Sequence, residues 1–187
     1  MRKPKGLSSR QRWRLDMQIQ LLKTHFDPEE GISVLDLGTE YGHTGCSVRG
    51  VFPHATITGV EVHKPTFLAC KEQAGECYDY LIHEDALTYL AETGDFFDVI
   101  IAAELIEHLP KDKGQILLQL LEKTGRLLIV TSPLGFKHQG ELYGNPHQVH
   151  VSGWEQKEMK ALGWETYALM PSATSPCSCA IYSKVSR

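Results

Sequence analysis

The sequence predicts an α/β fold built on one doubly wound, mostly parallel sheet of seven strands. Short, nearly continuous apolar runs alternate with helical patterns along the chain, which is typical of strands covered on both faces. Two further strand-like segments follow the last helical pattern and close the chain. The 187 residues, 42% of them hydrophobic and 22% charged, suit one globular domain with a substantial core and argue against a disordered or fibrous chain.

The expected strands are short segments rich in aliphatic and β-branched residues. The first stops at Gly38, and the second stops before the Lys64-Pro65 pair. A turn region at 171–176, rich in proline and serine, separates the last two. The seven strands are expected at residues 32–37, 56–62, 78–83, 96–103, 125–131, 164–170 and 177–185.

The expected helices lie before and between these strands. Residues 111–123 carry isoleucine and leucine at helical spacing, with Pro110 at the start and Gly125 at the end. Ser152 and Glu155 fit a capping box that would open a helix at 153–162. The other helices are expected at residues 8–25, 65–75 and 86–92.

One boundary is expected near residue 30, between a basic N-terminal segment with its helix (1–30) and the main domain (31–187). Residues 1–15 hold six cationic and no acidic side chains, whereas the rest of the chain holds 13 cationic and 23 acidic ones. Such a tail can meet an anionic partner or can simply keep the chain soluble.

Composition also bears on location. No apolar run approaches the ~18–20 residues of a membrane span, and none follows the basic start as in a signal peptide. The five cysteines do not form two C-x-x-C pairs, which argues against structural zinc. We therefore expect a reduced cytoplasmic protein with free thiols.

A glycine turn follows the first strand. There Gly38 and Gly42 allow the backbone to approach a ligand at the carboxyl edge of the sheet, and Asp36 is expected to accept hydrogen bonds from the turn amides. About 20 residues later, Glu61 ends the second strand, where a carboxylate can accept both hydroxyls of a ribose.

A third signal follows the third strand, where Asp85 and the Ala86 amide can face an adenine. The three signals together predict a nucleoside site, for which the residues allow a nicotinamide cofactor or S-adenosylmethionine. The nicotinamide interpretation lacks a downstream Tyr-x-x-x-Lys pair to polarise a carbonyl.

The whole series of motifs resembles that of class I S-adenosylmethionine-dependent methyltransferases, over roughly residues 30–185. It consists of Asp36-Leu37-Gly38-x-x-x-Gly42, Glu61, Asp85-Ala86, and Phe97-Asp98 leading to Glu104-Leu-Ile-Glu107-His108-Leu-Pro110. The resemblance implies a Rossmann-like sheet with a C-terminal antiparallel strand pair, and S-adenosylmethionine as cofactor. Its best-matched part is the segment from Glu104 to Pro110, which is similar to the segment after strand four in small-molecule O-methyltransferases.

One position departs from the family. Glu40 stands where these enzymes usually have glycine, so its carboxylate must point away from the methionine moiety or pair with its ammonium group. Glu104, after the fourth strand, is also placed on the cofactor side by the resemblance.

The acceptor side is expected around Glu104, Glu107 and His108, which share one face if the segment turns helically. The long segment 132–151 supplies three further histidines, His138, His147 and His150. Of these groups, Glu107, His108 and His150 are the catalytic candidates.

Carboxylates with imidazoles also suit a divalent cation. The Glu-x-x-Glu-His pattern is similar to the metal site of small-RNA 2′-O-methyltransferases and, in part, of ubiquinone-pathway O-methyltransferases. The resemblance implies Glu104, Glu107, His108 and either His147 or His150 as ligands. The alternative is that His108 is a general base or a plain pocket residue.

The expected function is therefore methyl transfer from S-adenosylmethionine to an oxygen of a small or medium-sized metabolite. The alternatives are a metal-assisted RNA 2′-O-methyltransferase and a non-catalytic nucleoside-binding module. Only about 30 N-terminal residues and segment 132–151 are left to cover the acceptor, so the pocket is open unless a second subunit closes it.

Overall fold

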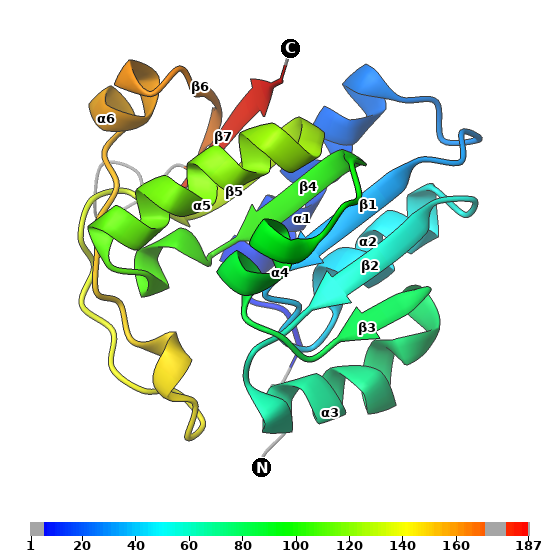
Figure 1. The fold of residues 1–187 in the computed structure, drawn as a ribbon, viewed down its shortest axis with the longest axis horizontal. Coiled ribbons are helices and arrows are strands. Elements are labelled where there is room, and N and C mark those ends of the chain that lie inside the picture. The colour runs from blue at the N-terminus through cyan, green and yellow to red at the C-terminus, as the bar shows by residue number, and fades with distance from the viewer. Residues whose placement is uncertain (1–5, 171–178, 187) are drawn as a thin grey trace.

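The chain folds around a single seven-stranded sheet, shown in Figure 1 as a computed structural model that describes residues 6–170 and 179–186. The strand order is β3-β2-β1-β4-β5-β7-β6. Strands β1 to β5 are parallel, and β7 runs antiparallel to both β5 and β6. The strands are β1 Ser33–Leu37, β2 Thr56–Val60, β3 Tyr80–Ile82, β4 Phe97–Ala103, β5 Gly125–Pro133, β6 Glu165–Leu169 and β7 Cys179–Val185. The predicted doubly wound, mostly parallel sheet with a terminal antiparallel pair is confirmed.

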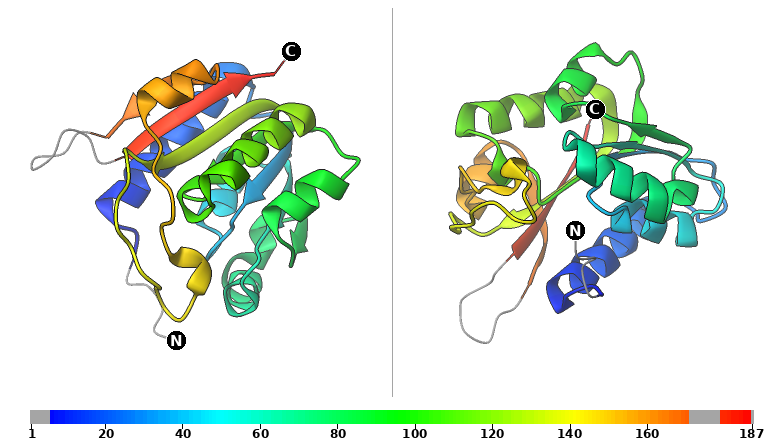
Figure 2. Two further views of the ribbon diagram at one scale, coloured as in Figure 1. Left: turned by 60° about the vertical axis from the view of Figure 1, so that its left-hand side comes forward. Right: turned by 90° about the horizontal axis from the view of Figure 1, so that it is seen from below.

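Helices cover both faces of the sheet (Figures 1 and 2). One face carries α1 Ser9–His25, α2 His43–Val51 and α3 Lys64–Ala74. The other carries α4 Ala86–Glu92, α5 Lys111–Thr124 and α6 Gln156–Ala161. Within residues 6–170 and 179–186, three short 3₁₀ helices lie in connections: η1 Gly75–Cys77, η2 Ile106–His108 and η3 Pro146–Gln148.

The two faces form two apolar cores because side chains alternate along each strand. On β1, Val34 packs with Leu22 of α1, whereas its neighbour Leu35 packs on the opposite face with Leu117 of α5. All four of these side chains are fully buried. The central strands β1, β4 and β5 are thus buried on both faces, as their sequences predicted.

Helix α1 is part of the first core. Its start is fixed by a capping box, in which the Ser8 hydroxyl accepts from the Gln11 amide and the Gln11 side chain accepts from the Ser8 amide. Leu21 and Leu22 are buried against the sheet. The predicted boundary near residue 30 falls between the end of α1 and the start of β1.

The expected capping box at residues 152–155 is wrong. The Ser152 hydroxyl donates to the Ile106 carbonyl and accepts from the Trp154 ring nitrogen, so it caps no helix. Helix α6 begins only at Gln156, after Glu155, which forms no capping hydrogen bond. The predicted turn at 171–176 and the first two residues of the last predicted strand lie outside the described residues.

The expectation of free thiols is corrected for one pair of cysteines. Cys46 of α2 and Cys77 of η1 form a disulfide, although 31 residues separate them in the sequence. Cys70 and Cys179 are both buried, and the thiol of Cys179 donates to Glu104. The pairing follows from α2 lying beside η1, which cysteine spacing does not reveal. Within residues 6–170 and 179–186, no helix is both long and apolar enough to cross a bilayer.

Candidate functional site

The turn between β1 and α2 adopts left-handed backbone at three positions. Gly38 and Gly42 have φ of 75° and 82°, and the non-glycine Glu40 has φ of 45°. A Cβ on Gly42 would lie only 2.4 Å from the Cβ of Ala74, so this glycine allows α3 to pack closely on the turn. Gly38, by contrast, borders a cavity at the strand ends.

Asp36 is held by a tyrosine, and the amide of Gly45 also stabilises its charged form. The Tyr78 hydroxyl donates to its carboxylate at 2.7 Å and accepts from the Gly45 amide at 3.3 Å, so the ring links the two. A Cβ on Gly45 or on Gly59 would come within 2.8 Å of this ring. Burial raises the pKa of Asp36 to about 6. Asp36 thus supports the turn through Tyr78, without bordering the cavity itself.

Glu61 is fixed at the end of β2 by two backbone amides. One carboxylate oxygen accepts from the His63 amide at 2.8 Å, and the other accepts from the Glu40 amide at 3.1 Å. The Glu40 side chain points toward segment 132–151, where its carboxylate accepts from the Gln148 amide group at 3.2 Å. Burial raises the pKa of Glu61.

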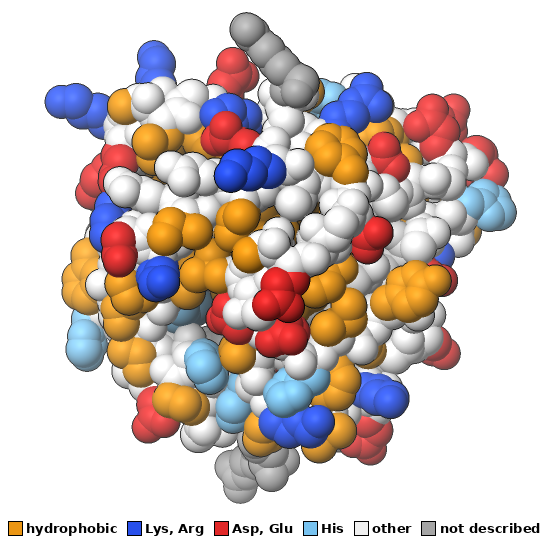
Figure 3. Space-filling model, in the orientation of Figure 1, with side chains coloured by type: hydrophobic (Ala, Val, Ile, Leu, Met, Phe, Trp, Pro, Cys, Tyr) orange, Lys and Arg blue, Asp and Glu red, His pale blue; other side chains and the backbone are white. Residues whose placement is uncertain are grey.

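A cavity lies at the carboxyl ends of β1 to β4, and we call it the strand-end cavity. Asn145, His147 and Gln148 close over it, and its free volume is about 80 Å³. Acidic and histidine side chains gather on this face of the molecule (Figure 3). From the sheet and α4, the cavity is bordered by Gly38, Glu40, Glu61, Asp85, Ala86, Glu104 and His108. Most of the residues predicted for the cofactor are thus brought together.

Asp85 and Ala86 open helix α4 beside this cavity. One oxygen of Asp85 accepts from the Leu87 and Thr88 amides, both at 3.0 Å, and so caps the helix. The Ala86 amide lies in the first turn, where backbone donors have no partner within the helix. Asp36 and Gly42 do not border the cavity; they shape the turn that does.

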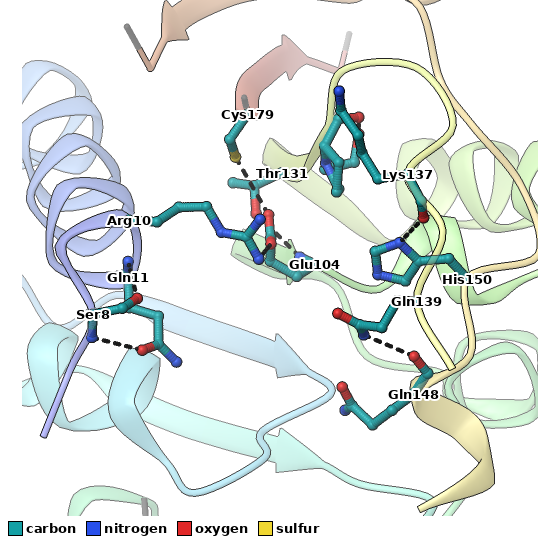
Figure 4. A network of polar contacts seen from close by, with 12 residues as sticks. Ser8, Arg10, Gln11, Glu104, Thr131, Lys137, Gln139, Gln148, His150 and Cys179 are labelled. Carbon is teal, nitrogen blue, oxygen red and sulfur yellow. Dashed lines mark hydrogen bonds and ion pairs between the residues drawn. The ribbon is translucent and has the colours of Figure 1, made fainter. Parts of the chain in front are cut away.

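Glu104 lies between this cavity and a second one. Its φ of 53° is unusual for a side chain of this kind, and its amide bonds to Thr131. Its carboxylate pairs with Arg10 of α1 at 2.9 Å and accepts from the thiol of Cys179 at 3.3 Å, as Figure 4 shows. Residues from both ends of the chain therefore hold this carboxylate.

The second cavity lies between α1 and segment 132–151, and we call it the helix-side cavity. Its free volume is about 230 Å³. It shares Glu40, Glu104, His108 and Gln148 with the strand-end cavity. Its other walls include Arg10, Arg14, Glu107, Gln139, Tyr143 and His150. The two cavities are therefore neighbours that meet at Glu104 and His108.

Glu107, His108 and His150 converge at this second cavity. The residues after β4 form the 3₁₀ helix η2, in which Glu107 is only 2% exposed. Neither of its carboxylate oxygens has a hydrogen-bond partner in the part of the chain that the structure describes. One ligand atom from each of the three residues lies within 4.8 Å of the others. Burial, reinforced by the neighbouring Glu104, raises the pKa of Glu107 well above its ordinary value.

Both histidines of this cluster are fixed by backbone carbonyls. Nδ1 of His108 donates to Val149 at 3.1 Å, and Nδ1 of His150 donates to Lys137 at 2.7 Å (Figure 4 shows the latter). Because each Nδ1 carries the hydrogen, each Nε2 of the neutral ring has a free lone pair. Burial lowers the pKa of His108, which favours its neutral form.

The predicted metal ligands are only partly brought together. His147 lies in the strand-end cavity, with its ring centroid 6.4 Å from that of His63. The carboxylate of Glu104 is occupied by Arg10 and Cys179. His150 therefore joins Glu107 and His108, while Glu104 and His147 lie outside this cluster.

Sequence reasoning missed several residues of the site. Tyr78 carried no signal, because its role depends on the space that three glycines leave for its ring. Arg10 and Arg14 could have been found from the sequence, because their spacing of four residues places them on one face of α1. Gln148 is recognised as a site residue only in the folded protein, where its side chain donates a hydrogen bond to Glu40.

Comparison with known proteins agrees with this geometry. No protein-family model matches the sequence, and no curated protein is similar to it in sequence. Many solved structures are similar in fold. Magnesium protoporphyrin IX methyltransferase from Synechocystis PCC 6803, with bound S-adenosylmethionine, matches with a TM-score of 0.68 at 15% identity, over 99% of this chain and 87% of that chain.

Two further structures are alike to a similar degree. The N-terminal domain of EvdMO1 with bound S-adenosylhomocysteine has a TM-score of 0.70 at 14% identity, over 97% of this chain and 83% of its own. The methyltransferase domain of bacterial CtHen1-C has a TM-score of 0.65 at 20% identity, over 93% of this chain and 97% of that domain. The chain has the class I methyltransferase fold. Within that fold, the strand-end cavity occupies the edge where β1, β2 and β4 present their carboxyl ends.

Proposed function

We propose that this protein transfers the methyl group of S-adenosylmethionine to an oxygen atom of a small or medium-sized metabolite. The observation that carries the proposal is the contact between the two cavities at Glu104 and His108. A donor held at the strand ends would face an acceptor held beneath α1. Methyl transfer is a direct displacement, so alignment of donor and acceptor is the main task of the protein.

The strand-end residues fit the nucleoside part of this cofactor. Glu61 is buried and oriented by two amides, which leaves its carboxylate prepared to accept ribose hydroxyls. Asp85 uses one oxygen for the helix cap, so its second oxygen and the Ala86 amide are suited to an adenine edge. When bound, the cofactor supplies an electrophilic methyl group on a sulfonium.

Residues of segment 132–151 would have to move for the cofactor to enter. The free volume of about 80 Å³ is well below the ~300 Å³ at which small-molecule sites begin. The Gln148 side chain holds this segment against Glu40 by one hydrogen bond. Val149 and Val151 are anchored by His108 and by the Glu107 carbonyl, so the part of the segment that contains Gln148 would have to move relative to these anchors when the cofactor enters.

The acceptor side offers two imidazole rings that can take a hydroxyl proton. Nε2 of His108 and Nε2 of His150 both have free lone pairs at the helix-side cavity. A neutral histidine within reach of a hydroxyl accepts its proton as methyl transfer proceeds. Because burial lowers the pKa of His108, this group stays available below the ordinary histidine pKa of 6.5.

A second candidate is metal-assisted transfer to a ribose 2′-hydroxyl of RNA, and the Glu107–His108–His150 cluster favours it. An uncompensated buried carboxylate beside two oriented imidazoles fits a divalent cation. Glu107, His108 and His150 would hold the ion, which would lower the pKa of a bound hydroxyl. The fold likeness to the CtHen1 domain is compatible with this candidate.

The main proposal is tested by calorimetry with S-adenosylhomocysteine and with NAD. We expect the former to bind and the latter not to bind. Glu61→Ala should weaken the affinity by about tenfold or more, because charge-assisted hydrogen bonds are worth ~1.5–3 kcal/mol. Glu72→Ala, an exposed carboxylate on α3, is the matched control and should bind as the wild type does. Absence of binding to a folded protein would reject the proposal.

The metal candidate has its own test. Mn²⁺ binding should be measured on the wild type, on Glu107→Gln and on His150→Ala, with His138→Ala as control because His138 is exposed on the same segment. Metal-assisted transfer predicts binding that Glu107→Gln and His150→Ala abolish and His138→Ala preserves. If the wild type binds no Mn²⁺, the metal candidate is rejected and a histidine is left as the acceptor of the hydroxyl proton.

A further inference from the structure

Arg14 is a buried cation that lies near carboxylates but forms no direct ion pair with any of them in the described part of the chain. Its side chain projects from α1 and is only 7% exposed, and it borders the helix-side cavity. Its Nε is buried without a hydrogen-bond partner, and Arg14 takes part in none of the ion pairs found among the described residues. A guanidinium removed from water in this way is destabilising unless something pairs with it.

The nearest carboxylates do not supply that partner. Asp36 receives its hydrogen bond from Tyr78, and neither Asp36 nor Glu107 lies within 4.0 Å of the Arg14 guanidinium. Both carboxylate oxygens of Glu107 are buried with no hydrogen-bond partner among the described residues, so they accept nothing from Arg14. Arg14 therefore has charge and donors that remain available to a group in the cavity.

The remaining charges of the cavity allow an anion beside Arg14. Glu104 is already neutralised by Arg10 at 2.9 Å, and Glu40 accepts from the Gln148 side chain. Arg10 lies one helical turn before Arg14 and borders the same cavity. Its Nη2 atom pairs with Glu104 (Figure 4), and its side chain is 44% exposed, which leaves the rest of its guanidinium group for a ligand while the ion pair stays in place.

We infer that Arg14, with Arg10 beside it, binds an oxyanion of the methyl acceptor, either a carboxylate or a phosphate group. The inference rests on the proposed function, because that function makes the helix-side cavity the acceptor site. Planar guanidinium groups bind both oxyanions with two parallel hydrogen bonds. The acceptor would thus be an anionic molecule, with its anion under α1 and its reacting oxygen toward His108 and Glu104.

The test uses the full chain saturated with S-adenosylhomocysteine and titrated by calorimetry with inorganic phosphate or with acetate. We expect one of the two anions to bind, and the preferred one identifies the source of the oxyanion. Arg14→Gln should weaken that binding by about tenfold to hundredfold, as for the loss of a charged hydrogen-bond donor. Arg12→Gln is the matched control, because Arg12 is exposed on the same helix and donates to the Leu7 carbonyl.

The outcomes separate this inference from the proposed function. If S-adenosylhomocysteine binds but neither anion does, or if Arg14→Gln binds the anion like the wild type, the inference is wrong and the methyltransferase proposal stands. If an anion binds through Arg14 but S-adenosylhomocysteine does not bind, the anion site stands and the proposed function fails. Should Arg14→Gln not fold, Arg10→Gln replaces it, with an expected loss of about twofold to tenfold.

Discussion

Removal of the Cys46–Cys77 disulfide should markedly lower the stability of the protein. The bond closes a loop across 31 residues, and the chain-entropy relation gives about 4 kcal/mol for a loop of this length. For a chain of 187 residues, this corresponds to a fall in Tm of roughly 8–16 °C. The Cys46→Ser/Cys77→Ser double variant avoids leaving one cysteine unpaired.

The effect should reach the cofactor site, because Tyr78 directly follows Cys77. The disulfide holds the Tyr78 segment against α2, and Tyr78 in turn supports Asp36 and the Gly45 amide. We therefore expect the double variant to bind S-adenosylhomocysteine more weakly than the wild type does. Urea unfolding and calorimetry measure the two effects separately.

Reductant provides the control for both measurements. It should destabilise the wild type to the level of the double variant and leave the double variant unchanged, and the unfolded wild type should show two fewer thiols before reduction than after it. If the variant unfolds within about 1 kcal/mol of the oxidised wild type, the loop-closure reasoning is wrong.

Three further changes test the site. Asp36→Asn should flatten the pH dependence of stability, which urea unfolding at several pH values measures. In the wild type, the pKa of this carboxyl is raised from 3.8 to about 6, so the free energy of unfolding falls by about 3 kcal/mol as pH rises through that interval. Gly42→Ala should destabilise by about 2 kcal/mol or more, because its Cβ would meet Ala74 at 2.4 Å and its φ is 82°, whereas Gly94→Ala, with open space around it, should unfold almost like the wild type. Glu107→Gln should increase thermal stability at neutral pH, since the raised pKa of Glu107 means that stability falls as pH rises above 4.5; a loss of stability there would contradict the burial argument.

Much of the fold follows from local sequence pattern. Runs that are apolar on both faces identified the central strands, and Pro110 and Gly125 bound α5 as expected. Glu61 and Asp85 could be placed in one site because the carboxyl ends of parallel strands meet at one edge of the sheet. These inferences need only periodicity and the rules of parallel sheets.

Other features depend on which distant surfaces meet, and local pattern carries no such information. The Cys46–Cys77 pair requires α2 to lie beside η1. Ser152 stands at a position that predicts a helix cap, but its hydroxyl instead donates to the Ile106 carbonyl and accepts from the ring nitrogen of the buried Trp154. His150, rather than His147, reaches Glu107 because the turn of η3 directs His147 into the strand-end cavity.

The helix-side cavity keeps two polar groups in an unfavourable state at once. Glu107 is buried with no hydrogen-bond partner, and the Nε of Arg14 is buried without one, yet the two do not form an ion pair. Direct contact would give each of the two groups a hydrogen-bond partner. Their separation instead leaves an acid group and a cation facing the same space of about 230 Å³. A ligand that carries an anion for Arg14 and presents an oxygen or a metal to Glu107 would give both groups a partner, and the cost of burying them unpartnered would then contribute to the binding free energy.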